Sequence, residues 1–236
     1  MSRKEASGKV ADLVVETVKA CPGAMIALPA GRTPEELYRE LVHRFRAGEV
    51  SFSETRFLLL TEFETAGPED PVSCRKSVED RFLARVDARP DRILVPSGEN
   101  IQKLDQLIDD AGGIALAILG IGQNGHFAYN EPTTQFSSPS HRQKLSPGTR
   151  RKLLEIYGGE LNVPEYAWTV GIRSIVSAGT IVVMAFGEEK AGPVFKMLYA
   201  RDDSLVPAAY LQIPRDVRVY LDAAAASQIS EKEGNT

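Results

Sequence analysis

A continuous apolar run covers residues 114–119, between Gly113 and Gly120. The run is too short for a helix and has no polar face, which is typical of a strand buried on both sides of a parallel sheet. Directly after it, Asn124, His126 and Glu131 occur within eight positions. Because open α/β sheets bind ligands beyond the carboxyl ends of their strands, we expect a functional site to begin here.

Patterns typical of strands and helices alternate along the rest of the chain. Short apolar runs predict strands at 24–29, 56–61, 93–96, 166–171, 181–187 and 217–221. Helical periodicity predicts helices at 4–20, 35–47, 73–86, 101–111 and from 188 onward, with a ragged tail from 223. This alternation predicts an α/β fold, a three-layer α/β/α arrangement around a mostly parallel, Rossmann-like sheet. No repeat or linker divides the chain, so residues 1–236 are expected to form a single domain.

Composition excludes several classes of protein. The formal net charge of −4 argues against a nucleic-acid partner, which would favour a basic face. No apolar run approaches the roughly 20 residues that a membrane span needs, and the first residues lack the apolar core of a signal peptide. The two cysteines are distant and lack metal-ligand spacing. We therefore expect a cytoplasmic protein without a membrane partner, a disulfide framework or a metal site.

The stretch after the first predicted strand favours anion binding. Ala30, Gly31 and Arg32 form a glycine-containing turn, Thr33 is a favourable N-cap, and Pro34 is favourable in the first turn of the helix that follows. A helix start of this kind directs free backbone N–H groups toward a ligand. The sequence therefore predicts an anion site over residues 30–34.

A dinucleotide site is the first alternative for the central stretch, since Gly120, Gly122 and Gly125 match the spacing of the nucleotide fingerprint. The context does not fit, because Pro132 interrupts the stretch where a helix should begin. No acidic residue follows at the position that would bind a ribose. We therefore do not expect nucleotide binding.

His126 has two interpretations. A lone histidine is commonly structural, buried and satisfied by its neighbours. Here Glu131 follows five residues later, across a turn, and could fold back to orient the ring. A histidine oriented by a carboxylate is a proton shuttle near neutral pH.

Residues 133–160 are polar and rich in Ser, Pro, Gly and basic residues, around an expected helix at 149–157. Such a segment is either a lid over a site or a solvated excursion of the chain.

Residues 120–132, Gly-Ile-Gly-Gln-Asn-Gly-His-Phe-Ala-Tyr-Asn-Glu-Pro, resemble the signature of glucosamine-6-phosphate deaminases, which are also called isomerases. Residues 28–34 resemble the phosphate loop of that family. Further matching segments follow in the family's order, at residues 47–52, 163–171, 187–190 and 211–213. The related 6-phosphogluconolactonases share the fold, but their motif normally lacks the Asn-Glu-Pro ending.

The resemblance implies a mechanism without metal or organic cofactor. A histidine opens the ring of an amino-sugar 6-phosphate of the glucosamine or galactosamine type. A carboxylate then moves a proton from C2 to C1, and ammonia leaves as a ketose phosphate forms. Carried over, His126 is the ring-opening group, Glu131 orients it, and Asn124 stands where many members have Asp. Lys190 matches the family's phosphate lysine, and the expected substrate-binding set is completed by Ala30, Gly31, Arg32, Thr33 and Gly122.

Two positions depart from the family's pattern. Thr61 stands where the family has its C2 base, an Asp, and a threonine hydroxyl is far too weakly basic for that role. Glu62 or Glu64 could substitute, but side chains alternate along a strand, so Glu62 should point elsewhere. Glu155 stands where the family has a phosphate-binding arginine. Arg32 could replace that guanidinium, or it is an ordinary solvated arginine.

The leading hypothesis is therefore a deaminating aldose–ketose isomerase of an amino-sugar phosphate. A lactonase that needs only His126 as base, and a non-catalytic sugar-phosphate sensor, remain alternatives. Family members range from monomers to hexamers, so a homo-oligomer is left open.

Overall fold

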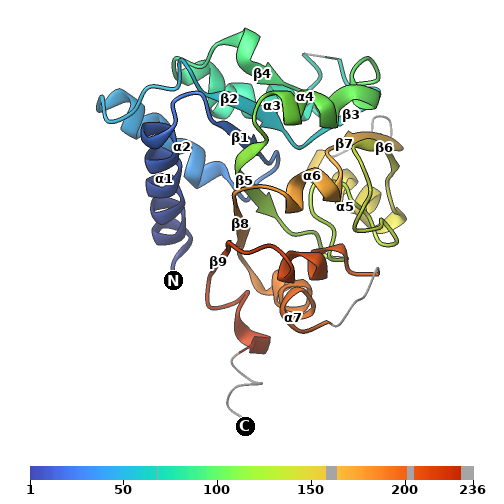
Figure 1. Ribbon diagram of the computed structural model, residues 1–236. Coiled ribbons are helices and arrows are strands. Elements are labelled where there is room, and N and C mark those ends of the chain that lie inside the picture. The colour runs from blue at the N-terminus through green and yellow to red at the C-terminus, as the bar shows by residue number, and fades with distance from the viewer. Residues whose placement is uncertain (68, 158–163, 201–204, 230–236) are drawn as a thin grey trace.

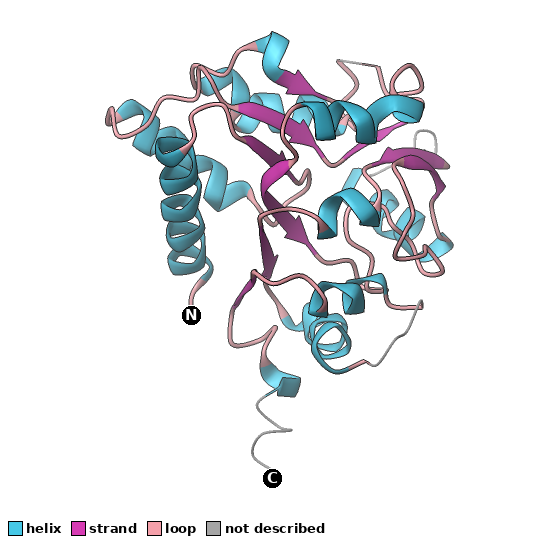
Figure 2. Ribbon diagram, in the orientation of Figure 1, coloured by secondary structure: helices cyan, strands magenta, loops and turns pink. Residues whose placement is uncertain are grey.

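A six-stranded parallel sheet forms the middle layer of the molecule (Figures 1 and 2). The computed structural model describes residues 1–67, 69–157, 164–200 and 205–229. The strand order is β4-β2-β1-β5-β8-β9, and every neighbouring pair is parallel. The strands are β1 Met25–Leu28, β2 Arg56–Leu59, β4 Ile93–Leu94, β5 Ile114–Gly120, β8 Thr180–Ala185 and β9 Val217–Leu221. The predicted three-layer α/β/α fold is confirmed.

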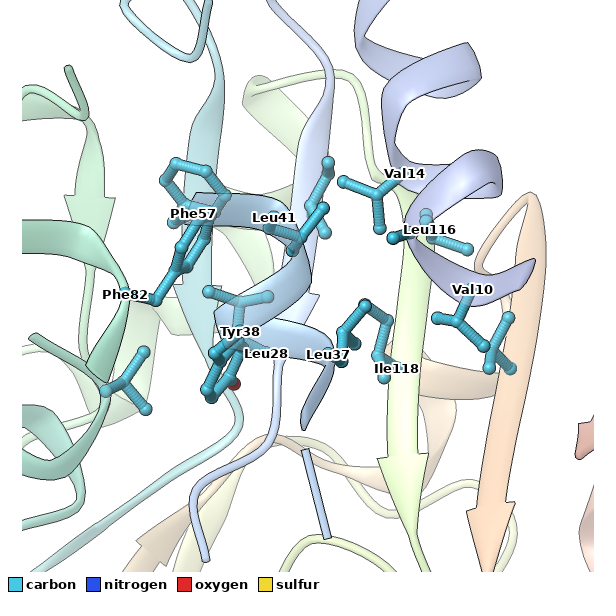
Figure 3. Packing of buried hydrophobic residues seen from close by; sticks show 14 of the residues in the cluster. Val10, Val14, Leu28, Leu37, Tyr38, Leu41, Phe57, Phe82, Leu116 and Ile118 are labelled. Atoms are coloured by element: carbon cyan, nitrogen blue, oxygen red, sulfur yellow. The ribbon is translucent and has the colours of Figure 1, made fainter. Parts of the chain in front are cut away.

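Side chains alternate between the two faces of the sheet, as the two-residue period of a strand requires. Leu116 and Ile118 of β5 pack into the cluster under the first helices, whereas Ala117 and Leu119 pack on the opposite face. Figure 3 shows the first cluster, where Leu37 and Leu41 meet the sheet. One face is covered by α1 Arg3–Ala20, α2 Glu35–Arg46 and α3 Cys74–Arg81, the other by α4 Leu104–Asp110, α6 Ile172–Val176 and α7 Ala191–Tyr199.

The strand order reverses beside β1. From β1 the chain passes through α2 to β2 on one side, and the other neighbour of β1 is β5, much later in the sequence. In open parallel sheets the loops leave such a pair of strands in opposite directions, which opens a crevice at their carboxyl ends. The two predicted functional stretches, residues 30–34 and 120–131, follow β1 and β5 respectively.

A second, antiparallel sheet differs from the prediction of one sheet. It consists of β3 Thr61–Phe63, β7 Tyr166–Thr169 and β6 His141–Lys144, in that order. The single strand expected over 56–61 is wrong, because the chain leaves the main sheet after β2. Leu60 joins both sheets, since its N–H donates to Leu28 (3.1 Å) and its carbonyl accepts from Val170 (2.9 Å). Strand patterns predict conformation, but they do not say which sheet a strand joins.

Several predicted helices are shorter than expected. The 73–86 helix ends at Arg81, before a 3₁₀ turn at Leu83–Arg85, and the 101–111 helix begins as a 3₁₀ turn at Ile101–Lys103. A 3₁₀ turn at Glu188–Lys190 likewise precedes α7, and two others lie at Pro90–Arg92 and Pro207–Gln212. Beyond residue 223 the chain is not ragged, because Ala225 is fully buried; residues 230–236 lie outside the described part.

The segment predicted as a lid contains β6 and one helix, α5 Pro147–Tyr157, which matches the helix expected at 149–157. The end of that segment, residues 158–160, lies outside the described residues, and a lid role stays a prediction. None of the helices in the described ranges combines the length and apolarity needed to cross a membrane.

Candidate active site

A cavity of about 450 Å³ opens at the carboxyl ends of β1 and β5. Residues 29–33 and 120–124 line it together with His126, so the two predicted stretches meet in one site. Further walls come from Thr61 at the start of β3, from α3 and from α5. The strand order explains this placement, because both loops leave the sheet at its point of reversal.

The loop after β1 is shaped by Gly31, whose φ of +96° lies in the left-handed region that favours glycine. The prediction that Thr33 caps the next helix is wrong: Pro34 occupies the N-cap, and no side chain caps α2. Thr33 lies one residue too early and faces the cavity with Ala30, Gly31 and Arg32. Without a side-chain cap, the first N–H groups of α2 remain donors for an anion.

Three side chains form the centre of the site. The imidazole Nδ1 of His126 lies 2.7 Å from Asn124 Oδ1, and Asn124 Nδ2 donates to Glu131 Oε2 (2.6 Å). Glu131 Oε2 is 3.8 Å from Nδ1, so Glu131 folds back toward the ring as expected, and the hydrogen bonds between the two run through Asn124. Asn124 lies between them because its short side chain reaches both groups from the same turn.

This chain of contacts determines the tautomer of His126. A carboxylate accepts hydrogen bonds only, so the amide nitrogen of Asn124 must face Glu131 and its oxygen must face the ring. An amide oxygen also accepts only, and Nδ1 therefore carries the proton. The other ring nitrogen, Nε2, then has a free lone pair in the neutral imidazole. A general base requires a nitrogen in this unprotonated form.

Burial lowers the pKa of His126 below its ordinary value of 6.5, and the neighbouring Lys190 ammonium lowers it further, against the opposite effect of the Glu131 carboxylate. The imidazole side chain is 16% exposed. Removal from water disfavours the charged form of the ring, so burial favours the neutral imidazole.

Gly122 makes room for this ring. A Cβ atom at that position would lie 2.3 Å from the imidazole carbon Cε1, and the Gly122 N–H donates to the His126 carbonyl (2.8 Å). Gly122 was predicted to bind substrate; it lines the cavity, and it also allows the imidazole to lie against the main chain.

The second oxygen of the Glu131 carboxylate is held by the start of α5. Thr149 Oγ1 donates to Glu131 Oε1 (2.5 Å), and the N–H of Ser146 donates to the same atom (3.3 Å). Ser146 also caps α5, because its hydroxyl accepts from the Thr149 N–H (3.2 Å). Glu131 is 3% exposed, and these donors offset the cost of burying its carboxylate.

Thr61 lines the cavity, but no acid accompanies it there. Its hydroxyl donates to Cys74 Sγ (3.5 Å), a thiol whose pKa is raised by burial and by the nearby Glu62 carboxylate. Glu62 points away, as strand alternation predicts, and accepts from Ser73 Oγ (2.9 Å) and from the N–H groups of residues 74 and 75 at the start of α3.

Glu64 is equally unavailable, because Arg142 binds both of its carboxylate oxygens (2.6 and 2.7 Å). Among the described residues that line the cavity, none is a carboxylate.

Four cationic side chains line the same cavity: Arg32, Arg81, Lys152 and Lys190. Lys190 Nζ donates to the carbonyl of Ile121 (2.8 Å), and burial lowers the pKa of its ammonium. Arg81 Nη1 donates to the carbonyl of Gly31 (2.7 Å), which places its guanidinium beside the predicted anion loop. The cavity is therefore suited to an anionic ligand.

Arg81 and Lys152 were missed by the sequence interpretation. Glu155 does not line the cavity; it is exposed and pairs with Lys152 (2.9 Å), one turn earlier on α5. The available signal was the i, i+3 spacing of this Lys–Glu pair, which puts both residues on one side of the helix. For Arg81 the sequence held no local signal, because its position in the cavity depends on how α3 packs beside α2.

Within the described ranges, no three His, Cys, Asp or Glu side chains come together as ligands for an ion. The arrangement consists of a neutral imidazole with a free nitrogen, a buried carboxylate behind it and cations around the cavity.

Comparison with known proteins identifies what this arrangement resembles. A family profile described as glucosamine-6-phosphate isomerases/6-phosphogluconolactonase matches residues 2–220. Glucosamine-6-phosphate deaminase from Bacillus velezensis is 37% identical over 229 residues, which cover 94% of this chain and 95% of the relative. Glucosamine-6-phosphate deaminase 1 from Bacillus subtilis is 33% identical, with 95% of both chains covered.

Solved structures give the same result. A monomeric glucosamine-6-phosphate deaminase superposes with a TM-score of 0.93 at 32% identity, over 97% of both chains. A 6-phosphogluconolactonase from Leishmania guyanensis has a TM-score of 0.72 at 17% identity, over 97% of this chain and 96% of that one. The second likeness concerns the fold alone.

Proposed function

Because the chain belongs to the family of glucosamine-6-phosphate isomerases and 6-phosphogluconolactonases, we propose that it is a sugar-phosphate enzyme that opens and isomerises an amino-sugar 6-phosphate, with release of ammonia. The observation that carries the proposal is the neutral His126, with Nε2 free, in a cavity lined by four cations. The identities of 33–37% with deaminases support the substrate class.

The first step of the proposed reaction, opening of the sugar ring, uses His126 and the cations that line the cavity. The phosphate binds at the start of α2, beside Arg32 and Lys190, which leaves the sugar ring near the imidazole. Nε2 of His126 takes the proton of the C1 hydroxyl, the bond between C1 and the ring oxygen breaks, and the ring oxygen receives a proton from the imidazolium. The product is the open-chain aldehyde, and His126 returns to its neutral form.

The second step moves a proton from C2 to C1. Protonation at C1 leaves an imine at C2, and water hydrolyses this imine to a ketose phosphate and ammonia. In the part of the chain that the structure describes, the cavity offers His126 as a base at neutral pH but no carboxylate. Burial raises the pKa values of Cys74 and Tyr129, which removes both as bases. His126 would therefore have to serve this step too.

The missing carboxylate favours a second candidate, hydrolysis of a sugar-phosphate lactone. There Nε2 of His126 would take a proton from water as the water oxygen attacks the lactone carbonyl. The bond between C1 and the ring oxygen would then break as that oxygen receives the proton from the imidazolium, which gives the open-chain acid and neutral His126. The cations of the cavity would stabilise the negative charge that develops on the carbonyl oxygen. No C2 base is needed for this reaction.

The two candidates are separated by product analysis. We expect ammonia and a ketose 6-phosphate from glucosamine 6-phosphate or galactosamine 6-phosphate, measured by a coupled ammonia assay and by NMR of the product. Hydrolysis of 6-phosphogluconolactone above its spontaneous rate, without ammonia from either amino sugar, would instead establish the lactonase. Calorimetric binding of these phosphates without any turnover would leave only the sensor.

Arg32 should contribute to phosphate recognition. Replacing it with glutamine removes a charge-assisted hydrogen bond, and we expect the KM of a phosphorylated substrate to rise about tenfold. Binding of the unphosphorylated sugar, measured by calorimetry, should not change. Arg39→Gln is the matched control, because Arg39 is an exposed arginine of α2 that pairs with Glu36 and does not line the cavity. Equal weakening of both ligands by Arg32→Gln would refute the role.

A further inference from the structure

The start of helix α5 contacts the catalytic network through Thr149 and through its N-cap, Ser146. This threonine is 8% exposed, and its hydroxyl donates to Oε1 of the buried Glu131. The other carboxylate oxygen, Oε2, accepts from the Asn124 amide that faces the ring. The Glu131 carboxylate thus connects Thr149, in the first turn of α5, with Asn124, whose amide determines the tautomer of His126.

The same helix lines the substrate cavity. Lys152 follows Thr149 by three residues, close to one helical turn, and it lines the cavity together with Leu153 and Tyr157. A ligand anion attracted by Lys152 therefore acts on the helix whose first turn holds Glu131. Lys152 and Thr149 therefore lie on one rigid element, which is a physical link between the cavity and Glu131.

We propose that Thr149 is a positioning residue that couples α5, and with it the occupied substrate cavity, to the proton arrangement of His126; the catalytic consequence rests on the function proposed above. Thr149 fixes Oε1, which leaves Oε2 for Asn124, and Asn124 then presents its oxygen to Nδ1. The imidazole is held with Nδ1 protonated and Nε2 free toward the substrate.

Loss of the Thr149 hydroxyl should disturb this series of hydrogen bonds. Oε1 would lose its short charge-assisted bond and keep the longer one from the Ser146 N–H (3.3 Å), so the carboxylate could rotate and Oε2 could leave the Asn124 amide nitrogen that donates to it. The Asn124 amide would then keep two longer contacts, from the His126 N–H to its oxygen (3.2 Å) and from its nitrogen to Ser146 Oγ (3.4 Å), which hold its orientation less strongly. A mixture of tautomers would leave part of the enzyme without a free Nε2, and turnover would fall without a change in phosphate affinity.

The chain provides a clean measurement, since it contains only three histidines. Nitrogen-15 NMR of the ring-labelled full-length protein distinguishes the two tautomers, with His43 and His141 as internal references. We expect the Nδ1–H tautomer at His126 in the wild type, a mixture in Thr149→Val, and the wild-type tautomer in Thr149→Ser, which keeps the hydroxyl. With an active substrate, Thr149→Val should lower kcat about tenfold at nearly constant KM.

Thr134→Val is the matched control. The Thr134 hydroxyl donates to the main-chain carbonyl of Glu131 (2.7 Å), not to its carboxylate, so its loss perturbs the same residue without freeing Oε1. An unchanged tautomer in Thr149→Val, or equal disturbance in Thr134→Val or Thr149→Ser, would overturn the inference. The tautomer is measured in the free protein. Lack of turnover of every sugar phosphate would therefore count against the proposed function and leave this test intact.

Discussion

Replacing His126 with glutamine should lower kcat by about 10²–10⁴-fold, the usual contribution of a positioned acid–base group. Glutamine retains a polar side chain of similar size, but it cannot take a proton from the C1 hydroxyl or return it to the ring oxygen. The measurement is steady-state turnover of whichever phosphate proves to be the substrate. We expect KM to change little, because the cations around the cavity bind the phosphate.

The control for this substitution is His43→Gln, which changes an exposed histidine of α2. The pH profile supplies a second check. The base form of His126 is the active form, so kcat/KM falls as pH decreases through its pKa. Burial places that pKa below 6.5, and the acid limb must therefore have its midpoint below that value. Activity retained in His126→Gln would mean that the chemistry takes place elsewhere.

The central strand of the main sheet was predictable because its signal is local and strong. The apolar run at 114–119 has no polar face, which is expected only for a central strand, and it is β5. The glycines that follow it, and the glycine turn after β1, placed the site at the carboxyl ends of these strands. The meeting of the two loops followed from the general rule for parallel sheets.

The small antiparallel sheet was not predictable from the same patterns. β6 consists of His141–Lys144, four polar residues that carry no apolar alternation. Its membership of a sheet depends on pairing with β7 and on contacts such as the stacking of Arg142 over Tyr166, with the guanidinium carbon 3.5 Å from the ring centre. These are partners about 25 residues apart in sequence, and no window of local sequence contains them.

Within the site, too, some placements could be predicted from local sequence and others could not. His126 could be predicted from its place after a strand, and Glu62 could be excluded by strand alternation. The hydrogen bond from Asn124 to Glu131 could not be predicted, because this contact depends on how one turn folds over itself. The contact between Thr149 and Glu131 was also hidden, since a helix that begins 16 residues after Glu131 brings the two together.

Thr61→Asp should raise deamination about 10²–10⁴-fold if the missing C2 base limits that reaction. Thr61 lines the cavity beside Cys74. Aspartate at this position would supply the one chemical group that the described cavity lacks for moving a proton from C2 to C1. The measurement is ammonia release from glucosamine 6-phosphate by the wild type and the variant, under identical conditions.

Thr61→Asn is the matched control, since it has the shape of aspartate without the charge or the basicity. It also corrects for the cost of a larger side chain at a position that is only 6% exposed, which is followed by thermal unfolding of both variants. Lactone hydrolysis requires no C2 base, so a lactonase should gain nothing from aspartate. A gain in ammonia release with aspartate but not asparagine would place the wild-type defect at this residue. Equal, unimproved deamination in two folded variants would show that the loss of a base at Thr61 is not what limits the reaction.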